Sequence, residues 1–79
     1  MGQYVQQVQV RGQDTRGQDV NWTAQSGDWE TRSLSLSGAN PPQFEPHGTY
    51  RITIPGQNES SWMFMGQDAQ FVNFELYGG

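Results

Sequence analysis

Apolar and polar residues alternate with a period of two along most of this chain, and this feature restricts the possible fold more than any other. The segment TRSLSLS (31–37) places Leu34 and Leu36 on one face and serines on the other. TYRITIP (49–55) alternates in the same way. A period of two is typical of half-buried β-strands, whereas helices repeat about every 3.6 residues. The pattern therefore predicts strands.

Three further segments extend this pattern. DVNWTAQ (19–25) and FVNFELY (71–77) alternate regularly, and YVQQVQV (4–10) does so less regularly. In the last of these, Val5 is out of phase with Val8, which predicts a bulge or a frayed start. Glycine-containing clusters such as QSGD and PGQNES separate the runs and are typical of turns. Within residues 61–77, one further strand should pair with 71–77 to form a hairpin.

These runs favour an all-β fold. We expect a small sandwich or a partly open barrel of about six antiparallel strands, with no substantial helix. The chain of 79 residues suffices for one small domain, so residues 1–79 are expected to form a single β domain. The longest connection, 38–48, holds three of the four prolines. Its Phe44 is expected to tuck back onto the core.

A short motif occurs four times: three copies fall where a strand is expected to end, and the fourth, 17–19, leads into a strand. GQD occurs at 12–14, 17–19 and 66–68, and GQN at 56–58. Glycine accepts a positive φ, and an Asp or Asn side chain hydrogen-bonds its own backbone two residues on, so the motif predicts turns. A calcium loop needs about six or more oxygen ligands, and DTRGQD offers two carboxylates with an arginine between them. We expect no metal and no other cofactor.

The charge of the chain narrows the choice of partner. There is no lysine, and the chain has four arginines and eight acidic residues, which gives a formal net charge of −4. Nucleic acids and anionic membranes are bound by clusters of basic residues. We therefore expect neither as a partner. Cysteine is absent, so a disulfide and a thiolate metal site are both excluded.

The start of the chain lacks the basic residues and the apolar run of a signal peptide, and no apolar run is long enough to span a bilayer. The expectation is a soluble protein that is cytoplasmic or associated with a virion.

Side chains for catalysis are sparse. The single histidine, His47, lies in the proline-rich connection, and no serine or cysteine accompanies it in a nucleophile pattern. Asp28 and Glu30 are separated by one residue at the expected start of a strand, and a carboxylate pair for hydrolysis would have to come from different strands. We therefore expect no enzymatic activity.

The segment 61–77 carries apolar residues on both faces. If its tryptophan and phenylalanine face inward, Met63 and Met65 face outward, and Phe71 and Tyr77 follow on the partner strand. Large exposed apolar groups mark interaction sites, and methionine and aromatic residues are enriched there. These four residues are therefore the candidate protein interface. Internal burial of both faces is the alternative.

A small domain without disulfides often gains stability from association. The leading interpretation is therefore a non-enzymatic structural protein that works through protein contacts in a homo-oligomer or larger assembly. A viral (phage) capsid-decorating or tail subunit would be one example. A glutamine-rich first strand without lysine could also add to a neighbouring sheet. A small protein inhibitor is a third interpretation.

A carbohydrate-binding, lectin-like domain is the alternative function. Amide side chains and tryptophans are abundant. Aromatic faces stack on the apolar face of a sugar ring, and amides and carboxylates bond its hydroxyls. Trp29 either caps the edge of the core or lies exposed, and Asp28 and Glu30 flank it. These three residues are the candidate sugar site.

Overall fold

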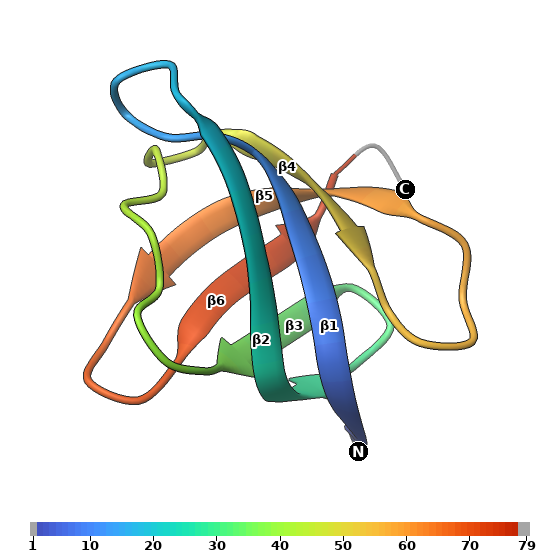
Figure 1. The fold of residues 1–79 in the computed structure, drawn as a ribbon. Coiled ribbons are helices and arrows are strands. Elements are labelled where there is room, and N and C mark those ends of the chain that lie inside the picture. The colour runs from blue at the N-terminus through green and yellow to red at the C-terminus, as the bar shows by residue number, and fades with distance from the viewer. Residues whose placement is uncertain (1, 78–79) are drawn as a thin grey trace.

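The computed structural model describes residues 2–77, which form six strands joined by turns and connections (Figure 1). The described residues contain no helix, and so none that is long and apolar enough to cross a membrane. The predicted all-β fold is confirmed. The strands are β1 (Gln3–Gln13), β2 (Asp19–Trp29), β3 (Ser33–Ser37), β4 (Thr49–Thr53), β5 (Ser60–Gln67) and β6 (Val72–Leu76).

The six strands close into an antiparallel barrel in the order β1-β2-β3-β6-β5-β4. Two meanders, β1-β2-β3 and β4-β5-β6, are joined by the connection 38–48, and β4 returns to lie beside β1. This is a Greek-key connection. Figure 1 shows β1 and β2 passing in front of β5 and β6, which form the opposite wall. Of the two architectures that the sequence left open, the chain forms the barrel, and the β1–β4 pairing closes it.

The inward-facing residues of all six strands fill the barrel. No polar or charged residue within 2–77 is buried. The strand alternation predicted the inward side of these elements, including the aromatic residues of β2, β4 and β6. The buried core consists of Val8, Val10, Val20, Trp22, Ala24, Leu34, Leu36, Phe44, Tyr50, Ile52, Ile54, Trp62, Phe64, Val72 and Phe74.

Phe44 lies in the connection 38–48 and not in a strand, yet only 5% of it is exposed. Its ring packs against four aromatic rings from β2, β4, β5 and β6, with centroid distances of 5.1–5.8 Å. The connection therefore closes one end of the barrel with a side chain. The expectation that Phe44 returns to the core is confirmed.

The change of phase at Val5 is present in β1, but the bulge or frayed start expected there is not, because β1 pairs with β2 from Gln3 onward without a register shift. Gln7 has a positive φ of 56°, and the pairing of β1 with β2 continues in the same register on both sides of it. Val5 packs against the core before Gln7, and Val8 faces the core after it. A left-handed backbone at Gln7 thus accommodates two inward phases in one strand.

The cluster QSGD is not a turn, contrary to the sequence expectation. β2 continues through it to Trp29, four residues beyond the predicted end at 25. Gly27 is buried and pairs with Leu36 of β3, and a Cβ there would approach a Leu36 methyl carbon to 2.6 Å. This glycine is therefore needed for close packing between strands and not for a turn.

The Tyr50 hydroxyl of β4 forms hydrogen bonds to the end of β1 and to the 38–48 connection. It donates to the carbonyl oxygen of Gln13 at 2.6 Å and accepts from the backbone N–H of Glu45 at 2.7 Å. The ring lies over Gly12, where a Cβ would approach it to 2.4 Å. Burial raises the pKa of the Tyr50 phenol, so the hydroxyl stays protonated and can donate throughout the neutral range.

We expect Tyr50→Phe to lower the free energy of unfolding by about 1–3 kcal/mol, because it leaves a backbone donor and a backbone acceptor without their partner. The ring and its packing are retained, so the fold should persist. Urea unfolding of the two proteins measures the difference. Equal midpoints would contradict the assigned role of the hydroxyl.

The seam between β1 and β4 closes the barrel with only three residue pairs. One of these pairs sets Arg11 opposite Arg51, two like charges on the same face of the sheet. Glu59 lies between them, with one carboxylate oxygen 2.6 Å from Arg11 and the other 3.1 Å from Arg51. The hydrogen bond from Arg11 and the two positive charges lower the pKa of Glu59. The carboxylate thus offsets a repulsion at the point of closure.

Glu59→Gln should melt at a lower temperature than the native protein at neutral pH. Because the pKa of Glu59 is lowered on folding, its ionised form stabilises the fold above the ordinary glutamate pKa of about 4.3, and this contribution is lost as the pH falls through the lower folded value. The two melting temperatures should therefore converge in acid. Melts at about pH 7 and about pH 3 test this. A gap that stays constant would refute it.

Candidate functional site

The hairpin of β5 and β6 carries apolar side chains on both faces. Trp62 and Phe64 of β5 face the core and are buried, as is Phe74 of β6. Met63 is partly exposed, and 46% of Met65 is exposed. The two methionines therefore lie on the face opposite the core, as the alternation of side chains along a strand predicts.

A β-bulge sets the position of Met65. Phe64 pairs with Phe74 and Gly66 pairs with Asn73, so Met65 is the extra residue on β5. A bulge bends the strand and re-aims the side chain of the unpaired residue. The bulge is not apparent in the sequence, because a glycine before Gln67 and Asp68 is equally typical of a turn.

The other two interface candidates lie at opposite ends of β6. Phe71 precedes the strand and is 39% exposed, and Tyr77 follows it and is 53% exposed. Met63 pairs with Glu75, so Tyr77 is its diagonal neighbour across the strand pair. The four candidates therefore follow the hairpin from the β5–β6 turn to the end of β6.

The turn beside Phe71 is held by its aspartate. A carboxylate oxygen of Asp68 accepts the backbone N–H groups of Gln70 and Phe71, both at 2.8 Å. These two donors lower the pKa of Asp68. The turn that presents Phe71 is therefore ordered by the aspartate of its own GQD motif.

Sequence reasoning missed one exposed aromatic residue. Tyr4, at the start of β1, is 71% exposed and is the most exposed of the large hydrophobic residues within 2–77. The signal was present, because an inward Val5 places Tyr4 on the outer face. β1 lies across the barrel from β6, so Tyr4 does not extend the candidate interface.

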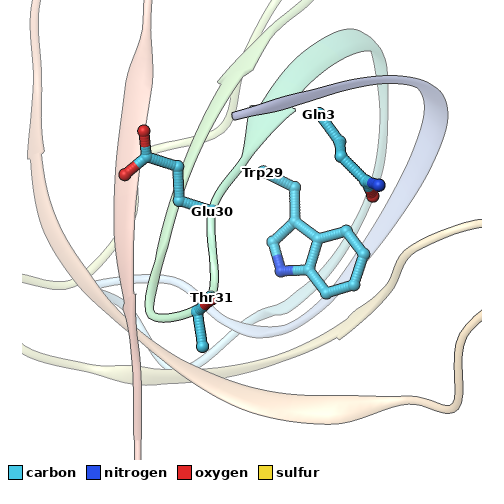
Figure 2. A pocket seen from close by; sticks show the side chains of 4 residues that line it. All are labelled: Gln3, Trp29, Glu30 and Thr31. Atoms are coloured by element: carbon cyan, nitrogen blue, oxygen red, sulfur yellow. The ribbon is translucent and has the colours of Figure 1, made fainter. Parts of the chain in front are cut away.

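The end of the barrel opposite Phe44 contains two hollows that meet at Trp29. The smaller, about 300 Å³, is lined by Gln3, Trp29, Glu30 and Thr31. Figure 2 shows the indole between Gln3 and Thr31, with the Glu30 carboxylate turned away from the ring. The structure thus brings Trp29 and Glu30 to one hollow. Asp28 lines neither hollow; its carboxylate lies against Gly2.

The larger hollow, about 370 Å³, combines an apolar floor with a polar rim. The β2–β3 turn, the β4–β5 connection and the end of β6 surround it, three segments that are far apart in the sequence. Its apolar lining residues are Trp29, Ile54, Trp62 and Leu76, and its polar ones are Thr31, Gln57, Asn58, Glu59 and Ser60. We call this the Trp29 hollow.

Trp29 itself is partly buried and packs against the core, so it caps the edge of the core and is also reached from the hollows. Its indole N–H is buried and has no hydrogen-bond partner within residues 2–77. The other two tryptophans differ: Trp22 donates to the carbonyl oxygen of Ala39 at 3.0 Å, and Trp62 to the hydroxyl of Ser60 at 2.9 Å. A buried donor without a partner costs about 1–3 kcal/mol.

The GQD and GQN motifs form turns and strand ends. Gly17 and Gly56 have positive φ values of 77° and 85°, as the turn prediction requires. Gly12 and Gly66 lie inside β1 and β5 and have no positive φ, so the prediction does not hold for these two copies. A carboxylate oxygen of Asp14 accepts the backbone N–H groups of Arg16 and Gln18 at 2.8 and 3.0 Å. Within residues 2–77, no three His, Cys, Asp or Glu side chains form a group that could hold a metal ion.

His47, the one candidate for acid–base chemistry, is exposed in the 38–48 connection. It has a positive φ of 61°, and its backbone N–H donates to the carbonyl oxygen of Phe64 at 3.1 Å. This backbone hydrogen bond of His47 anchors the connection to β5.

Comparisons of this chain with protein-family models, with curated proteins and with solved structures found no match.

Millimolar calcium should leave the melting temperature unchanged, because a cation that bound the folded state would raise it by mass action. The Asp14 and Asp68 carboxylates instead accept backbone N–H groups of their own turns. Thermal melts with calcium, with magnesium and with chelator provide the measurement. A rise with calcium that chelator reverses would show that one of these turns is a ligand loop.

Proposed function

We propose that this protein is a non-enzymatic subunit that self-associates through the outer face of the β5–β6 hairpin. The surface, called here the outer hairpin face, consists of Met63, Met65, Phe71 and Tyr77. The observation that supports the proposal is the exposure of these side chains on a barrel whose core is filled without them.

The neighbouring surface suits a contact between proteins. β3 presents Ser33, Ser35 and Ser37 beside β6, and the Ser35 hydroxyl donates to the Asn73 side-chain oxygen at 2.8 Å. Small uncharged side chains lose less on desolvation than charged ones. A standard interface buries about 800 Å² per partner, which is about a sixth of the 5120 Å² surface of this chain. The serines of β3 would therefore be part of the contact.

The charge on the hairpin limits the geometry of the contact. Glu75 pairs directly with Met63 and is exposed. If two copies associated so that the Glu75 side chains faced each other, two negative charges would lie close together, which is unfavourable. The proposed association therefore offsets the two hairpins, so that each Glu75 remains at the rim.

Met65→Glu and Met63→Glu should each lower the mass of the assembly in solution, because the new carboxylate would be buried at the contact without a partner. Association should weaken by several kcal/mol. The monomer should remain folded, since neither side chain contributes to the core. Size-exclusion chromatography with light scattering, together with a thermal melt, measures both effects.

Gln25→Glu is the matched control, because Gln25 is an exposed residue of β2, across the barrel from β5. It adds the same charge away from the outer hairpin face, and we expect no change in mass. If the native protein is monomeric at high concentration, or if the methionine variants keep the native mass, the proposal is wrong.

A further inference from the structure

The two ends of the barrel are closed in different ways. At one end, Phe44 fills the opening and packs against four aromatic rings. At the other end, the partly buried Trp29 and Leu76 lie at the edge of the core, and the Trp29 hollow remains between them and the surrounding loops. Its volume, about 370 Å³, lies within the range of about 300–1,000 Å³ that is usual for small-molecule sites.

The lining has the composition of a site for a small polar molecule with an apolar face. The floor carries an indole, and the rim carries two amides, two hydroxyls and a carboxylate. In Figure 2 the indole nitrogen lies on the side of the ring toward Thr31, which borders both hollows. This buried N–H has no partner within residues 2–77, so an acceptor oxygen of a ligand that reached it would form the missing hydrogen bond.

The loops around the hollow are held in place. Both oxygens of Glu59 bond to arginines of β1 and β4, which fixes the end of the β4–β5 connection. The backbone N–H of Glu30 donates to Ser33 within the β2–β3 turn, at 2.8 Å. The backbone N–H of Leu76 donates to Arg32, at 2.9 Å. A rim that is ordered before binding loses little entropy on taking a ligand.

We propose that the Trp29 hollow binds a neutral saccharide unit, with the Trp29 indole as the stacking surface and Gln57 and Asn58 as partners for the hydroxyls. A pyranose has an apolar face for the indole and hydroxyls for the amides. The net charge of −4 and the carboxylates of Glu30 and Glu59 disfavour acidic sugars. Of the three residues expected to bind a sugar, only Trp29 lines this hollow; Asp28 and Glu30 do not. The proposal is independent of self-association through the outer hairpin face.

The indole N–H groups provide a direct test by nuclear magnetic resonance. The native protein is titrated with glucose, galactose, mannose and N-acetylglucosamine, and with glycerol as a polyol that has no ring. The Trp29 signal is assigned as the one missing from Trp29→Phe. It should shift and saturate at millimolar concentrations of at least one sugar, whereas the Trp22 signal at the other end of the barrel should not move.

Variants of the rim decide whether the sugar lies in the hollow. Gln57→Ala and Asn58→Ala should each weaken binding about five- to tenfold, the effect of one lost hydrogen bond. Gln43→Ala, an exposed glutamine of the connection that closes the opposite end, should bind as the native protein does. The proposal is overturned if no sugar moves the Trp29 signal, if glycerol moves it equally, or if the rim variants bind as tightly as the native protein.

Discussion

The insertion of Phe44 among the aromatic rings of four strands is the contact on which the rest of this barrel depends. A chain of 79 residues without cysteine has to recover its conformational entropy from burial alone. Phe44 stacks on Phe64 and meets Trp22, Tyr50 and Phe74 edge-on. Edge-on and offset-stacked arrangements stabilise beyond the area that they bury. One side chain from a connection thereby joins strands of both meanders.

Local alternation contained most of the information about the strands and their faces. It gave the inward residues of β3, β4 and β6 and of the first half of β2, and it placed Met63 and Met65 on the face opposite Trp62 and Phe64. The alternation did not predict the role of Gly27. A single sequence does not distinguish a glycine in a turn from a glycine that packs closely against a neighbouring strand. Closure of the barrel could not be inferred either, since the pairing of β1 with β4 joins segments about forty residues apart and has no local signature.

The candidate sites illustrate the same limit. The outer hairpin face was predictable because its residues belong to one continuous hairpin, and strand periodicity decides which side each residue occupies. The Trp29 hollow was only partly predictable. Trp29 was identified as a candidate, but Gln57 and Asn58 were not, because they reach the same barrel end from a connection nearly thirty residues later. Asp28 was associated with Trp29 by proximity in sequence, although adjacent strand residues point to opposite faces.

The short β1–β4 seam has a consequence for the way in which an opened barrel would behave. If those three pairs separated, β1 and β4 would become the two edges of an open sheet, and exposed edges can pair with other chains. The residues on these edges include Arg11 and Arg51, two of only four basic residues in the protein. In the closed barrel they are bridged by Glu59. On an open sheet they would act as gatekeepers, because charged residues on an edge discourage edge-to-edge aggregation. The repulsion that Glu59 offsets at closure would thus protect the chain whenever the barrel opens.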